Sequence, residues 1–251
     1  MSSPRWVLSR TKAAVRAVPE VSQRFKCPLS VKLVIMDLDG TLVDTAPDIA
    51  ASINGMLADL GLPTYDRATI TDWVGGGASR LIKRALTGQV DGEPGSALYE
   101  RAGPLFRRHY GARVSQESTL YPGVAATLEA LCISGFELAC ITNKPEAFTV
   151  PLLKDLGIHD HFRLLLSGDT LPRGKPDPLP LRHACKYFGT SPNYSVMVGD
   201  SVNDTQAARA AGMPVICVTY GYNRGVDVRE LAPVAVIDEL SELPNYIRLY
   251  Q

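Results

Sequence analysis

The sequence has few cysteines, no long apolar run and no excess of either charge. Its five cysteines are scattered over 251 residues without a C-x-x-C pair, which argues against a disulfide framework or a zinc site and favours a reducing, cytoplasmic location. No apolar run approaches the roughly 18 residues of a membrane helix. The 26 basic residues balance 26 acidic ones, whereas nucleic-acid-binding surfaces are basic. Neither a membrane nor a nucleic-acid partner is expected.

The sequence also lacks the glycine-rich loops that bind the phosphates of nucleotides. There is no G-x-x-x-x-G-K-[ST] segment, and the residues after Gly75–Gly77 break the G-x-G-x-x-G pattern. The first 30 residues are basic, with Glu20 as the only acid, and they lack the long apolar stretch of a secretory signal. We expect residues 1–30 to form a basic, poorly ordered extension.

The remaining pattern predicts an α/β fold. Strands are expected in five apolar runs: 31–36, 137–142, 162–168, 195–200 and 214–221. Helical patterns separate the last four of these runs. Strands that alternate with helices imply βαβ units and a Rossmann-like, doubly wound parallel sheet. Between residues 47 and 118 we find helical patterns and no convincing strand. We therefore expect an α/β core of residues 31–46 and 119–251, and a helical insert of residues 47–118 that covers the end of the first strand.

Polar side chains follow several of the predicted strands. The first strand runs directly into Asp37 and Asp39, and a calcium loop does not fit there because its fifth and sixth positions would be Thr41 and Leu42. Other candidates come from the segments TNK, RGKPDP and GDSVND: Thr142, Asn143, Lys175, Asp200 and Asp204. Each segment alone is as typical of a turn, a solvated lysine or a helix cap. Because the carboxyl ends of parallel strands meet at one edge of a sheet, we expect all seven residues to share one crevice.

These groups suit phosphoryl chemistry. Several carboxylates at one point repel one another unless a hard cation such as Mg²⁺ lies between them, and Asp37 and Asp200 could bind it through side chains, with Asp39 using its backbone carbonyl. An ionised carboxylate can then attack phosphorus, and a second carboxyl can protonate the leaving oxygen. Lys175, the Thr142 hydroxyl and the Asn143 amide would hold the phosphoryl oxygens.

In this order, DLDGTLVD, TNK, GKPDP and GDSVND resemble the four motifs of the haloacid-dehalogenase (HAD) superfamily, and the helical insert resembles its C1 cap. The resemblance covers roughly residues 31–250. It implies that Asp37 is the nucleophile and Asp39 the general acid and base. It also implies that Thr142 and Lys175 bind phosphate, and that Asp37, Asp39 and Asp200 surround Mg²⁺, with Asp204 outside the metal's direct ligands.

A closer resemblance, to bacterial phosphoglycolate phosphatases, is carried by the chain length and three segments: DWVGGGASRLIKRAL, PEAFTVPLLKDLGI and GDSVNDTQAARAAGMPVICVTYGYN. It implies hydrolysis of the small molecule 2-phosphoglycolate. We expect a monomer or a homodimer. The main alternative is another small substrate, such as a sugar phosphate, a nucleotide or pyrophosphate. A phosphomutase or a non-catalytic binding protein is less favoured, and a dehalogenase is disfavoured because Asp39 is present.

Substrate choice is expected to depend on the helical insert. The GGGAS turn precedes a helical pattern and offers backbone N–H groups, such as that of Gly76, to an anion. Arg80 and Arg84 follow, and either could pair with a substrate carboxylate. A solvated helix face is the alternative interpretation for both arginines.

Overall fold

The computed structural model describes residues 25–250. At its centre lies a six-stranded parallel sheet in the order β6-β5-β2-β7-β8-β9. The strands are Leu164–Leu166 (β6), Glu137–Ile141 (β5), Leu33–Met36 (β2), Ser195–Gly199 (β7), Val215–Val218 (β8) and Ala235–Ile237 (β9). In chain order the sheet begins with β2, continues with β5 and β6 on one side of it, and ends with β7, β8 and β9 on the other side. This change of direction leaves a crevice at the carboxyl end of β2, where open α/β sheets bind ligands.

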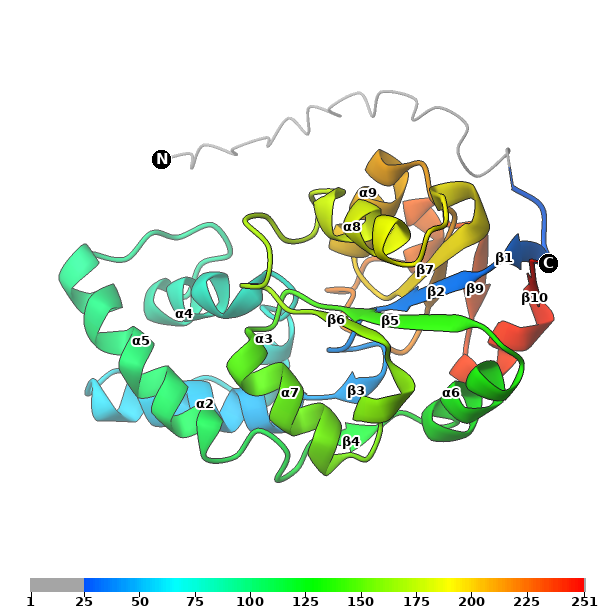
Figure 1. Cartoon of the computed structure of the whole chain (residues 1–251). Coiled ribbons are helices and arrows are strands. Elements are labelled where there is room, and N and C mark those ends of the chain that lie inside the picture. Colours follow the sequence, from blue (N-terminus) through cyan, green and yellow to red (C-terminus); the bar gives the residue numbers. More distant parts are fainter. Residues whose placement is uncertain (1–24, 251) are drawn as a thin grey trace, which may run out of the picture.

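Helices cover both faces of the sheet, as Figure 1 shows: α8 (Leu179–Tyr187) and α9 (Val202–Ala211) on one face, α6 (Val124–Ile133) and α7 (Glu146–Asp155) on the other. Successive side chains of a strand point to opposite faces, so Leu33 and Ile35 of β2 pack in one hydrophobic core and Val34 and Met36 in the other. Burial on both faces explains why this strand reads as an unbroken apolar run. The predicted doubly wound parallel sheet is confirmed.

The helical insert consists of four helices, and Figure 1 shows them together at one end of the central sheet. They are α2 (Ala46–Asp59), α3 (Arg67–Thr71), α4 (Gly77–Thr87) and α5 (Ser96–Gly111). The short strand β3 (Val43–Asp44) leads into them and pairs antiparallel with β4 (Thr119–Leu120), which leads out. The two connections to the helical insert therefore run side by side. Sequence analysis did not predict α3 or this two-residue strand pair.

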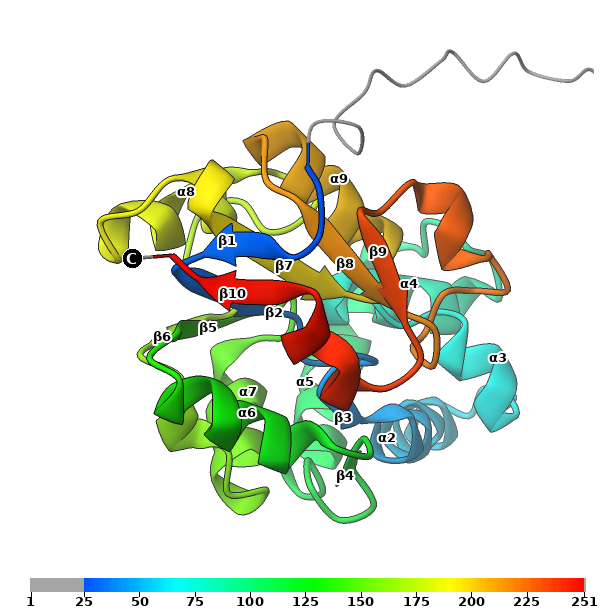
Figure 2. The ribbon, with the colours of Figure 1, turned by 90° about the vertical axis from the view of Figure 1, so that its right-hand side faces the viewer.

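A second small sheet joins the two ends of the described chain, as Figure 2 shows. Strand β1 (Leu29–Val31) pairs in parallel with β10 (Ile247–Leu249). Residues 29 and 30, which we expected in the extension, therefore belong to a strand; the extension up to residue 24 lies outside the described residues. Short 3₁₀ helices complete the fold: His159–His161, Pro192–Tyr194, Val228–Leu231 and Leu240–Asn245. Within residues 25–250 no helix is long and apolar enough to cross a membrane.

Candidate active site

The structure brings the predicted residues together at the carboxyl edge of the sheet. Asp37 follows β2, Thr142 follows β5 and Asp200 follows β7, while Lys175 lies in the loop after β6. A cavity of about 40 Å³ is lined by five of the seven predicted core residues: Asp37, Asp39, Thr142, Asn143 and Lys175. The other two, Asp200 and Asp204, each offer a carboxylate oxygen within 4.8 Å of one from Asp37.

Lys175 joins two of these carboxylates. Its Nζ lies 2.7 Å from Asp37 Oδ1 and 2.6 Å from Asp204 Oδ1, and its side chain is buried. Burial lowers the pKa of Lys175, but the charges of Asp204 and Asp37 outweigh burial, so the net pKa is raised. Asp204 is itself fixed at the start of α9, where its carboxylate accepts hydrogen bonds from the backbone and hydroxyl of Ser201. The lysine therefore stays charged and holds Asp37 in place.

Asp200 is held by groups from two other segments. Its Oδ1 accepts a hydrogen bond from Thr41 Oγ1 at 3.0 Å, and its Oδ2 accepts one from the Tyr222 backbone at 2.6 Å. A Cβ added to Gly221 would lie 2.4 Å from Asp200 Oδ2, so only glycine allows this approach. Burial, with a smaller effect of Asp204, raises the pKa of Asp200 to about 7.

The three carboxylates fit a hard divalent cation. Burial and the neighbouring charge of Asp204 raise the pKa of Asp37 well above its ordinary value. Its buried Oδ1 contacts Lys175 as an ion pair but has no hydrogen-bond partner within residues 25–250. A cation bound among Asp37, Asp200 and Asp204 would offset this repulsion, and all-oxygen ligation is the preference of Mg²⁺. That the backbone carbonyl of Asp39 also contributes stays a prediction.

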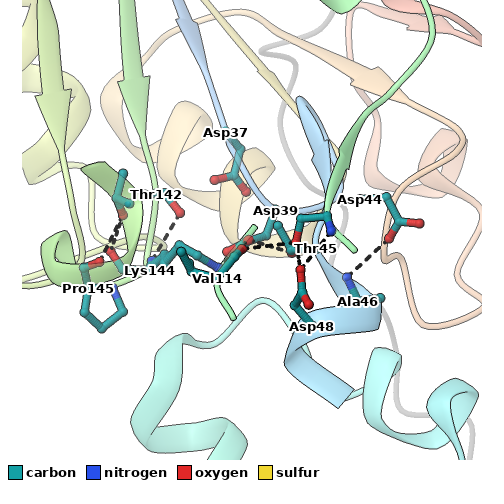
Figure 3. A network of polar contacts seen from close by, with 12 residues as sticks. Asp37, Asp39, Asp44, Thr45, Ala46, Asp48, Val114, Thr142, Lys144 and Pro145 are labelled. Carbon is teal, nitrogen blue, oxygen red and sulfur yellow. Dashed lines mark hydrogen bonds and ion pairs between the residues drawn. The ribbon is translucent and has the colours of Figure 1, made fainter. Parts of the chain in front are cut away.

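Figure 3 shows the Asp39 side chain among contacts to Thr45 and Lys144, which Asp37 does not share. Its Oδ1 accepts hydrogen bonds from Thr45 Oγ1 and from Lys144 Nζ, both at 2.7 Å. Asp37 and Asp39 therefore have different surroundings although one residue separates them. Sequence analysis missed Lys144, whose only signal was its place as the third residue of the TNK segment.

Comparisons with known proteins agree with this site. The family model of haloacid dehalogenase-like hydrolases matches residues 34–218. The chain belongs to this family. It is 54% identical over 215 residues to a phosphoglycolate phosphatase of Thiobacillus denitrificans (86% of this chain and 95% of the relative). It is 51% identical over 221 residues to one of Nitrosospira multiformis (88% and 97%). The crystal structure of a predicted phosphoglycolate phosphatase from Haemophilus somnus superposes with a TM-score of 0.81 at 38% identity, covering 85% of this chain and 96% of that one.

In this haloacid dehalogenase-like hydrolase, the helical insert contacts the core through the carbonyl oxygen of Gly75. Asn203 Nδ2 donates to that oxygen at 2.7 Å, and Asn143 Nδ2 donates to it at 3.4 Å. Asn143 Nδ2 also donates to the Lys175 carbonyl at 2.8 Å. The amide nitrogen that we expected to hold a phosphoryl oxygen is therefore directed at protein carbonyls.

The three candidates from the insert do not line the cavity that contains Asp37. Arg84 is buried and donates to the carbonyls of Trp73 at 2.6 Å and Val90 at 2.9 Å. Burial, followed by the charges of two neighbouring arginines, lowers the pKa of Arg84 to about 10. Arg80 pairs with Asp91 in solvent. Gly76, Arg80 and Arg84 line a second cavity of about 560 Å³, and their part in substrate binding stays a prediction.

Proposed function

We propose that the protein hydrolyses 2-phosphoglycolate to glycolate and phosphate, with Mg²⁺ and through an aspartyl-phosphate. The observation that carries the proposal is the placement of Asp37 and Asp39 on one small cavity in opposite environments. Asp37 lies among buried acids beside Lys175, whereas Asp39 is bound to Thr45 and Lys144. The relatives at 41–54% identity, each named a phosphoglycolate phosphatase, supply the substrate.

In the first step Asp37 attacks phosphorus and the bond from phosphorus to the glycolate oxygen breaks. The leaving oxygen takes a proton from the carboxyl group of Asp39. In the second step Asp39 removes a proton from water, and this water attacks the phosphorus of the aspartyl-phosphate, which releases phosphate and restores Asp37. Mg²⁺ bound at Asp37 and Asp200 would offset the negative charge of the phosphoryl group.

Two groups are suited to hold the phosphoryl oxygens. Thr142 Oγ1 accepts a hydrogen bond from the Lys144 backbone at 3.1 Å, so its own hydrogen remains available for an oxygen of the substrate. Lys175 carries a fixed positive charge beside the attacking carboxylate. Preorganised donors of this kind stabilise the charge that develops in the transition state.

The cavity favours a small substrate. On the insert side its walls include Ile49, Leu81 and Phe106, and the core adds Phe148. With about 40 Å³ of space in this conformation, it suits a two-carbon acid better than a nucleotide. We propose that residues 47–118 act as a cap over the core, which shields the reaction from bulk solvent. A cytoplasmic location, expected from the scattered cysteines, is part of the same proposal.

The test is phosphate release with Mg²⁺ from 2-phosphoglycolate, a hexose phosphate, a nucleoside monophosphate and pyrophosphate. We expect the highest kcat/KM for 2-phosphoglycolate and no turnover by Asp37→Asn. Another preferred substrate would leave the mechanism standing and refute the substrate. If Asp37→Asn released phosphate at the wild-type rate, the aspartyl-phosphate route would be wrong.

A further inference from the structure

Two buried polar groups on the cavity have no part in the mechanism above. Lys144 is 5% exposed, and its Nζ lies 2.7 Å from Asp39 Oδ1 and 4.8 Å from the ring centre of Tyr110. Tyr110 is 2% exposed, and its hydroxyl lies beside Lys144 but makes no hydrogen bond of good geometry within residues 25–250. Both residues line the cavity that contains Asp37 and Asp39.

The Tyr110 hydroxyl is an exception that needs a reason, because buried polar groups in native proteins nearly always have a partner. The ring is held in place by aromatic neighbours: its centre lies 5.5 Å from that of Phe106 and 4.8 Å from that of Phe148. Lys144 has three N–H donors, and Asp39 uses one. The cavity therefore presents a cation and a hydroxyl that can both still donate.

We propose that the Lys144 ammonium and the Tyr110 hydroxyl bind the carboxylate of the substrate and thereby select phosphoglycolate. This inference rests on the proposed function. Asp39 gives its proton to the ester oxygen, and in phosphoglycolate the carboxylate carbon lies only two covalent bonds of about 1.5 Å from that oxygen. Since Lys144 Nζ is 2.7 Å from Asp39 Oδ1, the carboxylate of a substrate in position for proton transfer lies within reach of the ammonium.

Charge supports the same assignment. A carboxylate in an apolar cavity is strongly unfavourable without a cation beside it. Among the described residues that line this cavity the cations are Lys144 and Lys175, and Lys175 is already enclosed by Asp37 and Asp204. Arg80 and Arg84 of the insert line the other cavity. Lys144 is thus the cation placed to meet the substrate carboxylate.

The loss of Lys144 has different effects if this lysine only positions Asp39 and if it binds the substrate carboxylate. If it served only to hold Asp39, its loss would slow every substrate whose leaving oxygen needs a proton. If it binds the carboxylate, its loss penalises phosphoglycolate far more than an analogue without that group. The analogue we choose is 2-hydroxyethyl phosphate, which has the same chain length and an uncharged end.

The experiment measures kcat/KM for both substrates in Lys144→Met and Tyr110→Phe. We expect the preference for phosphoglycolate over 2-hydroxyethyl phosphate to fall about 100-fold in Lys144→Met, since one partner of a buried charge pair is removed. In Tyr110→Phe, which loses only an oxygen, we expect about a 10-fold fall. Lys154→Met, an exposed lysine of α7, is the matched control and should keep the preference.

Binding gives a second readout. In the inactive Asp37→Asn background, the non-hydrolysable analogue 3-phosphonopropanoate should bind about 100-fold more weakly when Lys144→Met is added, and unchanged when Lys154→Met is added. Calorimetry measures this without turnover. If Lys144→Met fails to fold, Tyr110→Phe carries the test.

Three results would overturn the inference. An equal loss on both substrates in Lys144→Met and Tyr110→Phe would make these residues positioning or structural ones. A loss of preference in Arg80→Met, with the two variants unaffected, would move the carboxylate to the second cavity. A preference for phosphoglycolate that survives both variants would refute the inference and leave the proposed function standing. If the wild type itself shows no preference, the proposed function is wrong, and the two failures can thus be told apart.

Discussion

Asp48, in the first turn of α2, is expected to fix the two connections between the helical insert and the core. Its side chain is 0% exposed. Asp48 Oδ2 accepts hydrogen bonds at 2.8 Å from the backbones of Glu117 and Ser118 and from the Ser118 hydroxyl. Its Oδ1 accepts a hydrogen bond from Arg113 Nε at 3.2 Å. The start of the insert is thereby bonded to the segment that leaves it.

Replacing Asp48 by alanine would leave two backbone N–H groups without their acceptor, and the Ser118 hydroxyl would keep only the Val114 carbonyl at 3.2 Å. Hydrogen bonds to a charged group contribute about 1.5–3 kcal/mol each and are not additive, so we expect the free energy of unfolding to fall by about 3–5 kcal/mol. At about 2–4 °C per kcal/mol for a chain of this size, Tm falls by about 6–20 °C. Asp48→Asn keeps an oxygen for the three donors at Oδ2 but turns an amide toward Arg113, and should cost about 1–2 kcal/mol.

Thermal unfolding followed by calorimetry and circular dichroism measures both variants. The control is Asp59→Ala, which removes a partly exposed partner of Arg108 and His109 at the surface of the insert. Exposed pairs contribute little, so this Tm should stay close to that of the wild type. The reasoning is refuted if Asp48→Ala unfolds within 2 °C of the wild type (less than the ~2–4 °C expected for 1 kcal/mol), or if the asparagine variant is the less stable of the two.

Two further predictions concern the acidic cluster. Gly221→Ala places a Cβ 2.2 Å from the Cβ of Asp200, so we expect Asp200 to be displaced and the Mg²⁺ concentration for half-maximal activity to rise at least about 10-fold; an unchanged Mg²⁺ titration would contradict this. Because burial raises the pKa of Asp200 from 3.8 to about 7, the folded metal-free chain holds this proton more tightly than the unfolded chain. Its contribution to stability is present below about pH 4 and is lost as pH rises to about 7. Mg²⁺ should therefore raise Tm more at pH 8 than at pH 5.5, and equal gains would disprove the argument.

The elements that could be predicted from the sequence are those with a strong pattern of apolar residues. Four of the five predicted strands of the main sheet are almost entirely buried and β6 is partly buried, and each predicted helix of the core is at least nine residues long. The missed elements are short. Helix α3 has five residues with only Ile70 buried, so it shows no helical repeat of apolar residues. Strand β10 forms by pairing with β1 from the other end of the chain, and such a pairing leaves no local signal.

The candidate site was predictable where it depends on strand ends. Parallel strands align their carboxyl ends, so Asp37, Thr142 and Asp200 had to meet once the strands were assigned. Tyr222 could not be found in this way. Its backbone holds Asp200, and its hydroxyl donates to Asp44 Oδ1 at 2.6 Å and accepts from the Thr45 backbone at 2.7 Å. These contacts depend on the path of the loop after β8, which no motif specifies.

The GGGAS turn shows how the insert meets the core, because the carbonyl of Gly75 accepts hydrogen bonds from Asn143 and Asn203. That the N–H groups of this turn bind an anion stays a prediction. A neutral hydrogen bond contributes only about 0.5–1.5 kcal/mol, so these two contacts set the register of the insert more than its stability. Elsewhere on the lining of the cavity, Phe106 of the insert packs edge-on against Phe148 of the core with ring centres 6.2 Å apart. The apolar contact joins the insert to the core on this part of the cavity, while the asparagine that follows Thr142 ties the position of the insert to the segment that we propose binds phosphate.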